Sequence, residues 1–340
     1  MCGFFGLHSF SVDRNEKITV SKKAIELLNS RGPDSNGIEL EDNNNLILSH
    51  NRLAILDLSE TGNQPMCSIS GNLSIVFNGE IYNHLNLRKK LNNENKFNHW
   101  KGSSDTETLI QAIDIWGIEK TLEELNGMFS FALWNRKLKT LFLARDRFGE
   151  KPLYFYKNDK EFIFGSEIKF IKNLINQKLE INKKQIFRTL NLGYRAIHQS
   201  QETYFNNIYS LKSGSNITIQ KNLKLKKKKY WKPKFNLNTE YFYEDIVIQA
   251  KKKLEKSLEL RLRSDVPIAF CLSGGVDSSY LASLAVKKFK KKIQTFSIID
   301  DDKRYDERDN IKKILKDLNC KNKEIKLKNK NVNFFSRLRR

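Results

Sequence analysis

Cys2 directly follows the first methionine of the sequence, and this position gives it two reactive groups. A small residue at position 2 is the usual condition for removal of the methionine, which would leave the α-amine and the thiol on one residue. An α-amine titrates near ~7.7–8.0, so it can accept a proton at neutral pH. Cys2 therefore offers a nucleophile together with its base. The alternative is an inert small residue near the start of a strand, and the surrounding sequence must decide.

A second candidate site is the segment SGGVDSS, Ser273–Ser279, which directly follows the apolar run Val266–Leu272. Gly274 and Gly275 leave backbone N–H groups uncovered, and three serines add hydroxyl donors. A helix that begins here would add positive potential at its N-terminus, so the segment is suited to hold phosphate groups. It is not a P-loop, because the pattern GxxxxGK[ST] occurs nowhere in the chain.

A series of further segments spans roughly the first 210 residues. They are SRGPDSNG (30–37), SHNRLAILD (49–57), VFNGEIYNH (76–84), GSSDTE (102–107), LNGMFSFALW (125–134), ARDRFGEKPLYF (144–155) and FGSEIKFI (164–171). In this order, and with Cys2 ahead of them, they resemble the N-terminal-nucleophile glutaminase domain of class II glutamine amidotransferases.

That resemblance implies a nucleophile and an oxyanion hole. Cys2 would attack the side-chain amide of glutamine, giving a thioester and ammonia, while its own α-amine relays the proton. The Asn78 side chain and the Gly79 backbone N–H would stabilise the oxyanion, and glycine lets the backbone approach closely. An Asn-Gly pair taken alone would usually be a hairpin turn.

The same resemblance assigns the recognition of the substrate L-glutamine. Arg52 would bind the α-carboxylate, for which a planar guanidinium is suited. Glu80 and Asp105 would bind the α-ammonium. Arg31, in the Arg-Gly-Pro-Asp turn, would shape the site rather than react. Ser30 stands where many members of the family have histidine, at a position without a chemical role.

The SGGVDSS segment resembles the pyrophosphate loop of ATP pyrophosphatases, which implies ATP and Mg²⁺ as cofactors. Leu272 and Ile298 would flank the adenine, and Asp277 would bind Mg²⁺ or order the loop. The full set of residues expected to bind ATP is Leu272, Ser273, Gly274, Gly275, Asp277, Ser278, Ser279 and Ile298.

A class II glutaminase followed by this loop resembles the glutamine-hydrolysing asparagine synthetases, which are carbon–nitrogen ligases. The resemblance implies that ATP and Mg²⁺ convert the side-chain carboxylate of L-aspartate to an acyl-adenylate. Ammonia from glutamine would cross an internal tunnel and displace AMP, giving asparagine, glutamate, AMP and pyrophosphate. It also admits a homodimer.

Members of that family run well beyond 500 residues, whereas this chain reaches Arg340. The later SGEGADE-type loop and a later lysine-containing segment have no counterpart in the sequence. We therefore expect a fragment or a C-terminally truncated chain that lacks the acceptor pocket for aspartate. Such a chain would be competent at most for the hydrolysis of glutamine.

The elements that must position the first site are short strands with few helices. Helices are expected at residues 21–30 and 106–116, the second capped by Ser103 or Ser104 and ended by Gly117. Together the elements predict an α+β Ntn-hydrolase sandwich of two antiparallel sheets with helices, over residues 2–215. Strands are expected from runs bounded by Gly, Asn or charged turns, at residues 46–53, 73–77, 129–135, 140–145, 153–156 and 162–165.

Residues 216–243 are expected to form a late strand and a linker. Lys226–Lys229 are expected to be a solvated linker, with an anion-binding patch as the alternative. The β-turn-α-β-α order that follows is the beginning of a doubly wound α/β domain, incomplete over residues 244–340. Its expected elements are a helix at 244–263, a buried parallel strand at 266–272, a helix at 278–288, a strand at 294–299 and a helix at 310–319.

Composition excludes several classes of protein. Hydrophobic residues make up 39% of 340, too many for a disordered chain, and no apolar stretch is long enough for a membrane span. Four cysteines without CxxC or Cys/His metal spacing give neither a disulfide framework nor a metal site. Cys67, Cys271 and Cys320 are expected to be buried small residues. A soluble protein of the reducing cytoplasm is expected.

The net charge of +22 is concentrated in the second part of the chain. Residues 1–220 carry a net charge of +4, whereas residues 221–340 carry 33 basic and 15 acidic residues, a net of +18. A basic nucleic-acid-binding or tRNA-modifying ATP pyrophosphatase is one alternative. Against it, the basic residues are scattered and no aromatic-rich RNA-binding motif accompanies them, so nucleic acid is not an expected partner.

Two further points stay open at the level of the sequence. The same two domains could amidate another carboxylate, such as a sugar acid in surface polysaccharide synthesis. The acidic segment Asp300–Asp309 follows a strand at the edge of the sheet where ligands bind, so it could approach Mg²⁺ and ATP or form an exposed loop.

Overall fold

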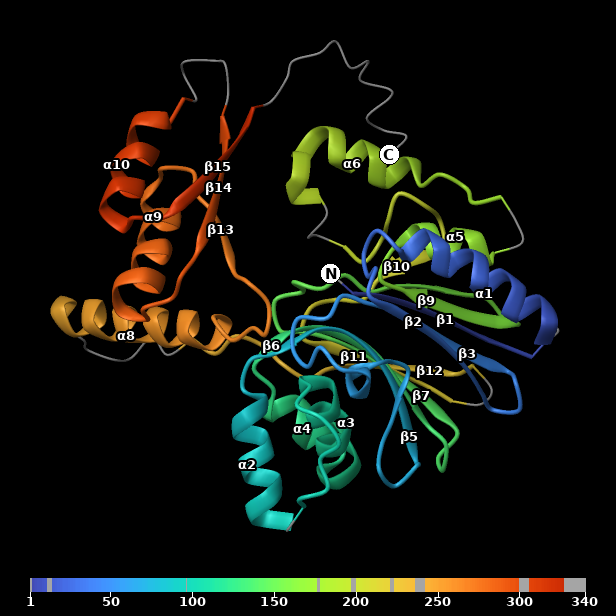
Figure 1. Ribbon diagram of the computed structural model, residues 1–340. Coiled ribbons are helices and arrows are strands. Elements are labelled where there is room, and N and C mark those ends of the chain that lie inside the picture. The colour runs from blue at the N-terminus through green and yellow to red at the C-terminus, as the bar shows by residue number, and fades with distance from the viewer. Residues whose placement is uncertain are drawn as a thin grey trace. The chain divides into compact units, whose positions relative to one another are not determined.

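The computed structural model describes residues 2–10, 14–95, 97–175, 178–196, 200–220, 223–235, 242–299 and 306–326 (Figure 1). Its contacts divide the chain into two compact units, Met1–Asn236 and Leu237–Arg340. Each unit is described by itself below, as unit 1 and unit 2.

Unit 1 contains two six-stranded sheets in which all neighbouring strands are antiparallel. The first sheet has the order β10 (Ile208–Ser210), β8 (Tyr154–Lys157), β9 (Glu161–Gly165), β1 (Gly3–Ser9), β3 (Leu46–Arg52), β2 (Ser35–Glu41). The second has the order β12 (Leu225–Lys229), β11 (Ser215–Ile219), β7 (Thr140–Arg145), β6 (Gly127–Asn135), β5 (Leu73–Ile81), β4 (Met66–Cys67).

The two sheets pack face to face, because one hydrophobic core contains side chains of both, among them Phe4 of β1 and Trp134 of β6. The opposite face of each sheet is covered by helices. Along β6, Ala132 and Trp134 belong to the core between the sheets, whereas Phe131 and Leu133 pack toward the helices. Burial on both faces explains why these strands are continuously apolar, and it confirms the predicted sandwich.

The helices of unit 1 fall into two groups. Ile25 of α1 (Arg14–Leu28) and Phe170 of α5 (Ile168–Leu174) pack on the first sheet. α2 (His84–Asn95), α3 (Asp105–Trp116) and α4 (Ile118–Glu124) pack on the second. α6 (Lys183–Leu192) and the 3-10 turns η1 (Glu60–Gly62) and η2 (Gly193–Arg195) also belong to this unit. At α3 the expected cap is present, since the Ser104 side chain accepts a hydrogen bond from Glu107 N.

The structure differs from the expected domain boundary at residue 215. β11 pairs with β7, with Asn216 opposite Ala144, and β12 pairs with β11, so the second sheet extends to Lys229. Lys226–Lys229 therefore form an edge strand rather than a linker. Their side chains are exposed, and lysines on an edge strand oppose pairing with another chain.

Unit 2 has a three-stranded parallel sheet of order β13 (Ala269–Cys271), β14 (Gln294–Ile299), β15 (Lys321–Lys326). Its helices are α8 (Tyr243–Arg261), α9 (Val276–Ser283), which continues as the π-helical turn η3 (Leu284–Lys288), and α10 (Arg308–Leu318). The alternation of helices with parallel strands confirms the predicted α/β class. β15 was not expected, because its lysine-rich sequence has little strand character.

Some expectations about burial are wrong. In the strand expected to be buried at 266–272, Ala269 and Cys271 are exposed, because β13 is the edge of the sheet in the described part of unit 2. Cys67 is exposed as well, since it lies in the short edge strand β4, and Cys320 is half-buried.

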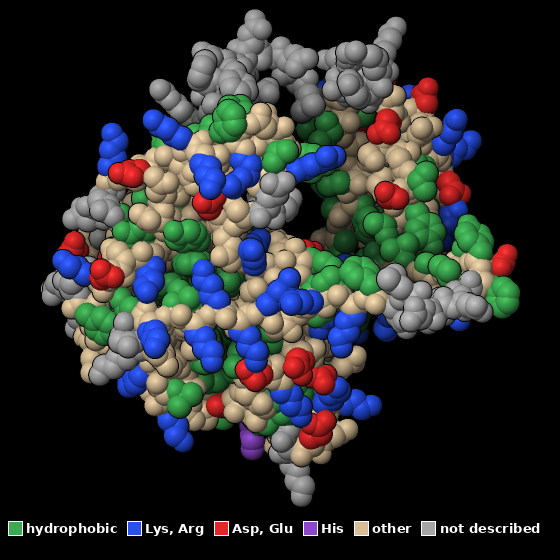
Figure 2. All heavy atoms as spheres, turned by 180° about the vertical axis from the view of Figure 1, so that it is seen from behind, with side chains coloured by type: hydrophobic (Ala, Val, Ile, Leu, Met, Phe, Trp, Pro, Cys, Tyr) green, Lys and Arg blue, Asp and Glu red, His purple; other side chains and the backbone are tan. Residues whose placement is uncertain are grey.

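Lysine and arginine side chains are spread across the face seen in Figure 2, with aspartate and glutamate between them. Within the described ranges, no helix combines the length and the apolar character needed to cross a membrane.

Candidate active site

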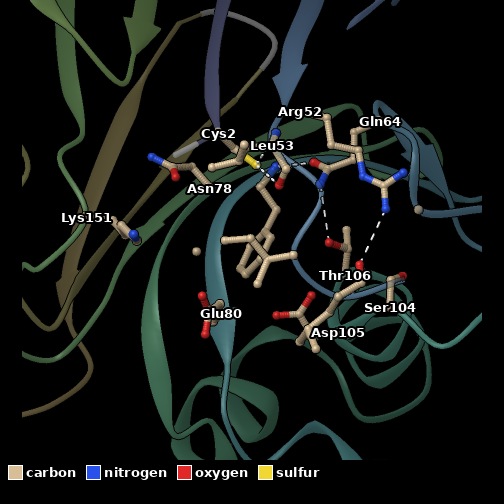
Figure 3. A pocket seen from close by; sticks show the side chains of 15 residues that line it. Cys2, Arg52, Leu53, Gln64, Asn78, Glu80, Ser104, Asp105, Thr106 and Lys151 are labelled. Carbon is tan, nitrogen blue, oxygen red and sulfur yellow. Dashed lines mark hydrogen bonds between the residues drawn. The ribbon is translucent and has the colours of Figure 1, made fainter. Parts of the chain in front are cut away.

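One pocket in unit 1 brings together all six residues that the sequence assigned to glutamine hydrolysis (Figure 3). They come from the start of β1, the end of β3, the C-terminal half of β5 and the first turn of α3. The antiparallel pairing of β1 with β3 carries the N-terminus to the end of β3. The lining residues are Cys2, Arg52, Leu53, Ile55, Leu56, Gly62, Gln64, Phe77, Asn78, Gly79, Glu80, Ser104, Asp105, Thr106 and Lys151.

The Cys2 thiol lies against the backbone of Leu53. Leu53 N–H donates to Cys2 Sγ at 3.3 Å, and Cys2 Sγ is 3.5 Å from the Leu53 carbonyl oxygen. Burial raises the pKa of the Cys2 thiol, and Asp105 acts in the same direction, whereas the Leu53 N–H and the Lys151 ammonium lower it. The group is therefore a thiol at neutral pH and needs a base before it can attack.

Arg31 holds the backbone of Cys2 from the turn after α1. Its Nε donates to the Cys2 carbonyl oxygen at 3.0 Å, and its Nη1 forms a 2.6 Å ion pair with Glu167. Glu167 precedes α5 in the FGSEIKFI segment, so two distant motifs meet at the N-terminus. This geometry supports the expectation that Arg31 shapes the site.

Asn78 is a buried polar side chain that faces the pocket from β5. Its side chain is 1% exposed, and its Nδ2 has no hydrogen-bond partner within the described residues. A buried amide donor without a partner costs stability, on the order of 1–3 kcal/mol. Such a donor in a pocket is available to an oxygen atom of a ligand.

The backbone N–H of Gly79 points toward the same pocket. Gly79 lies opposite Phe129 in the β5–β6 pairing. Phe129 N–H donates to Asp146 Oδ2 at 3.2 Å and its carbonyl accepts from Asp146 N at 2.8 Å, so both groups point away from β5. The pair is therefore a non-hydrogen-bonded one, and the Gly79 N–H points away from β6.

The N–H groups of β5 on either side of Gly79 point in the same direction and are both occupied. Phe77 N–H donates to Gln64 Oε1 at 2.6 Å, and Ile81 N–H donates to Asp105 Oδ2 at 2.8 Å. Gly79 lies between them and lines the pocket. Its N–H and Asn78 Nδ2 are thus two donors from adjacent residues at the pocket.

A glycine is required at position 79 by the approach of β6. A Cβ atom there would lie 2.2 Å from the Met128 carbonyl oxygen and 2.7 Å from Phe129 Cα. Any larger residue would push β5 from β6 and displace the donor pair.

Arg52 organises the loop that closes one end of the pocket. A Cβ atom at Gly62 would lie 2.0 Å from Arg52 Nη2, so this loop is built around the guanidinium. Both terminal nitrogens already donate to loop oxygens. Nη1 donates to Ser59 O at 2.7 Å and to Asn63 Oδ1 at 3.0 Å, and Nη2 donates to Leu56 O at 3.4 Å and to Asp57 O.

The Asp57 carboxylate connects this loop to the segment before α3. It accepts from Ser59 Oγ at 2.5 Å, from Thr61 Oγ1 at 3.0 Å and from Ser103 N at 2.8 Å. Burial raises the pKa of Asp57, but these hydrogen bonds outweigh it and bring the pKa to about 2. The loop therefore keeps a fixed negative charge over the whole physiological pH range.

Asp105 and Glu80 form the acidic side of the pocket. Burial raises the pKa of Asp105, the hydrogen bond from Ile81 N lowers it and the nearby Glu80 carboxylate raises it, with a result of about 7. A buried carboxyl that titrates near neutral pH is typical of a functional site. A bound cation would favour its ionised form.

The other nine lining residues were not assigned to the site from the sequence, among them Gln64 and Lys151. Gln64 accepts from Phe77 N and donates through Nε2 to Thr106 Oγ1 at 3.3 Å, which ties the loop to β5 and α3. Lys151 is 6% exposed and lies in the ARDRFGEKPLYF segment. The segment can be recognised from the sequence, but the sequence does not show that this side chain lines the pocket. Nothing in the local sequence at these positions indicates which side chains face the pocket.

In unit 2, the SGGVDSS segment forms a tight loop between β13 and α9. Ser273 N donates to Ser278 Oγ at 3.3 Å, and Gly275 N donates to Ser273 Oγ at 3.3 Å. Gly274 has φ +82, a value that favours glycine, and Gly275 is the N-cap of α9. Ser279 Oγ donates to Gly275 O at 2.6 Å. A loop rich in glycine and serine at a helix N-terminus fits a phosphate chain.

The residues expected to flank an adenine differ in their surroundings. Ile298 is 66% exposed, whereas the Leu272 side chain is 2% exposed and belongs to the core of unit 2. The Leu272 side chain is thus not available to a ligand, and its backbone N–H donates to the Phe296 carbonyl oxygen at 2.8 Å. Asp277 is exposed in the first turn of α9. In the acidic segment Asp300–Asp309, residues 300–305 lie outside the described residues, and Asp306 pairs with Arg308 at 2.6 Å.

No group of three or more His, Cys, Asp or Glu side chains with the arrangement of a metal site occurs within the described ranges.

Comparisons with known proteins match segments of both units to protein families. Residues 1–231 match the glutamine amidotransferase domain family, and residues 249–334 match the asparagine synthase family. The chain is 34% identical to the putative asparagine synthetase [glutamine-hydrolyzing] 2 of Methanocaldococcus jannaschii, covering 92% of this chain and 62% of that protein. It is 32% identical to asparagine synthetase [glutamine-hydrolyzing] 3 of Bacillus subtilis, over 88% of this chain and 48% of that protein.

A third relative is the amidase chry2 of Gibberella zeae, at 29% identity over 82% of this chain and 40% of that protein. The chain thus spans between two fifths and two thirds of the length of these relatives. Among solved structures, the allosteric regulatory enzyme of purine biosynthesis matches with a TM-score of 0.50 at 15% identity, covering 95% of this chain and 80% of that one. At this identity the match shows a shared fold.

Proposed function

Since this chain belongs to the glutamine amidotransferase domain family and carries a segment of the asparagine synthase family, we propose that the pocket at Cys2 hydrolyses the side-chain amide of glutamine. The observation that carries the proposal is the pair of donors beside the thiol, Asn78 Nδ2 and the Gly79 N–H. Two donors fixed on a strand match an oxygen that becomes negative during attack at a carbonyl.

In the proposed reaction, the α-amine of Cys2 takes the proton of its thiol and Sγ attacks the amide carbon of glutamine. The carbonyl oxygen becomes an oxyanion, which accepts hydrogen bonds from the Asn78 and Gly79 donors. Collapse breaks the C–N bond, the amine proton passes to the nitrogen, and ammonia leaves. Water then attacks the thioester, and glutamate is released with the thiol restored.

Recognition of the amino-acid end of glutamine is assigned to charged groups of the same pocket. Asp105 and Glu80 would bind the α-ammonium, for which their negative charge is suited. Arg52 would attract the α-carboxylate while it holds the loop through its terminal nitrogens.

The proposal is tested by the formation of glutamate and ammonia from glutamine by the purified protein. Equal amounts of the two products are expected. A folded protein from which the first methionine has been removed, and which forms neither product, would contradict it.

The second half of the proposal concerns the whole protein of which these two units form part. We infer that the SGGVDSS loop binds the phosphates of ATP, that Asp277 contacts Mg²⁺, and that the ammonia aminates a carboxylate activated by ATP. The match to asparagine synthase favours aspartate as that carboxylate, with asparagine, AMP and pyrophosphate as products. The tunnel for ammonia, the homodimer and the cytoplasmic location stay predictions.

The similarity to a relative named as an amidase keeps a second acceptor open. Unit 1 would serve either acceptor unchanged, because it supplies only ammonia. The two acceptors are separated by measuring, with the full-length protein, how much aminated product forms from aspartate and how much forms from sugar acids.

The substitution Asp105→Asn is expected to change both the pH profile of glutamine hydrolysis and the stability. Because the pKa of Asp105 is about 7, the carboxyl is mostly neutral at pH 6 and ionised at pH 8. Binding of the α-ammonium, and with it kcat/KM, should therefore rise with pH in the wild type. The variant should have a kcat/KM lower by about tenfold or more at pH 8 and should lack this rise.

The pH dependence of the stability is opposite in sign to that of kcat/KM. The folded-state pKa of about 7 lies above the ordinary value of 3.8 for an aspartate, so the folded protein binds more protons and loses stability as pH rises between these values. Asp105→Asn should therefore have the higher Tm at pH 8. A lower Tm together with unaltered hydrolysis would show that Asp105 serves the fold alone.

The substitution Ser278→Ala is expected to weaken binding of ATP with Mg²⁺ by about tenfold, because it removes a hydroxyl that orders the loop by accepting from Ser273 N. Ser283→Ala, at the end of the same helix, is the control. Titration calorimetry gives both affinities, and glutamine hydrolysis should be equal in all three proteins. Equal affinity for ATP in both variants, or none in the wild type, would remove the assignment.

A further inference from the structure

Lys151 lies in the pocket at Cys2 but has no part in the reaction proposed above. It comes from the turn after β7 and is 6% exposed, which is rare for lysine. In Figure 3 it lies on the side of the pocket where Asn78 and Glu80 are found. A buried ammonium in a pocket with a nucleophile adds positive electrostatic potential to a site where negative charge develops during attack.

The backbone of Lys151 is held in place by its own segment. Its N–H donates to Asp146 Oδ2 at 3.0 Å, and its carbonyl accepts from Arg145 Nε at 2.7 Å. Asp146 is fully buried and also accepts from the N–H groups of Phe148, Gly149 and Glu150. The turn is therefore fixed by several hydrogen bonds to one carboxylate, and the lysine starts from a rigid position.

The same carboxylate connects this turn to the donor pair. Asp146 bonds both backbone groups of Phe129, the residue opposite Gly79. Lys151 and the Gly79 N–H are thus placed by one buried network. That arrangement is expected of a residue whose position relative to the site matters.

Several charged groups act on Lys151, and they differ in sign. Burial lowers the pKa of its ammonium, and the positive charge of Arg31 acts in the same direction. The pKa is raised by Glu80, Cys2 and Glu150. On the Cys2 thiol, Asp105 and Lys151 act in opposite directions. Lys151 therefore opposes the carboxylate of Asp105 at the thiol, as the N-terminal ammonium of the chain also does.

We propose that Lys151 is a positioning residue for glutamine hydrolysis, whose buried ammonium stabilises the thiolate of Cys2 and the negative charge formed on attack. The proposal rests on the proposed function for its kinetic part. Its electrostatic part holds for the thiol itself and can be measured without turnover.

The substitution Lys151→Met keeps the length of the side chain and removes its charge. Lys151→Arg keeps the charge, and Lys160→Met, at an exposed position, is the matched control. The rate at which iodoacetamide alkylates Cys2 is measured against pH for each protein, with the Cys2 peptide followed by mass spectrometry because Cys67 and Cys271 are exposed. Circular dichroism verifies the fold of every variant.

Lys151→Met should move the rise of Cys2 alkylation to higher pH by about one unit, and should lower kcat/KM for glutamine about tenfold at pH 7. Lys151→Arg should restore most of both, and Lys160→Met should match the wild type. An identical alkylation profile in a folded Lys151→Met protein would overturn the proposal. If the wild type hydrolyses no glutamine, the proposed function fails, whereas the alkylation profile still decides the role of Lys151.

Discussion

Replacement of Cys2 by alanine is expected to abolish glutamine hydrolysis and to leave the fold intact. The thiol is the only nucleophile that the protein supplies in the proposed reaction, and removal of the nucleophile from a serine protease lowers kcat by about 10⁶-fold. Cys2 Sγ contacts only the backbone of Leu53 by hydrogen bonding in the described structure, and the side chain is half-buried. The loss of so small a group should change the free energy of unfolding by about 1 kcal/mol.

The measurement is glutamate release by purified wild type, Cys2→Ala and Cys67→Ala proteins. Cys67 is exposed and lies outside the pocket, so its variant controls for the loss of a thiol. Hydrolysis that persists in Cys2→Ala would refute the role of this residue. An inactive Cys67→Ala protein would point to a different nucleophile.

The second large effect is expected at Asn78. Loss of one donor of an oxyanion hole lowers kcat by about 10²–10³. Asn78→Ala removes the Nδ2 donor and should lower kcat by that factor with little change in KM, because the oxyanion exists only after attack. Asn78→Asp replaces the donor by a charge that repels the oxyanion and should be less active still.

Stability separates this role from a structural one. Nδ2 of Asn78 has no partner within the described residues, so its loss should not lower Tm. Asn216→Ala, which alters a buried asparagine of β11 in the same sheet, is the control and should retain full activity. A rise in KM with unchanged kcat in Asn78→Ala would place this side chain at substrate binding rather than at the oxyanion.

Much of unit 1 could be predicted from the sequence, because its strands are apolar on both faces and end at clear turns. The cap of α3 is an example, since Ser104 and Gly117 mark both ends. A late strand was expected in this region, but the bounds and the pairing of β12 could not be predicted in this way. Its lysines have no apolar period, and it is a strand only because β11 offers it an open edge.

The candidate site was predicted through its motifs, and the structure adds what motifs do not contain. The Gly79 N–H faces the pocket because both backbone groups of Phe129, the residue opposite it on β6, are hydrogen-bonded to Asp146 at the end of β7. That Lys151 lines the pocket at Cys2 depends on how the turn after β7 packs. Direction and burial of a side chain arise from packing between distant segments, so a local pattern cannot give them.

The central claim is that Cys2 forms a covalent bond with the substrate. The most direct measurement is to mix the purified protein with glutamine, quench with acid before a single turnover ends, and locate the acyl group by peptide mass spectrometry. We predict a glutamyl thioester on Cys2, with the first methionine absent from the same peptide. Hydrolysis of glutamine without an acyl group on Cys2, or with one on another residue, would contradict the account.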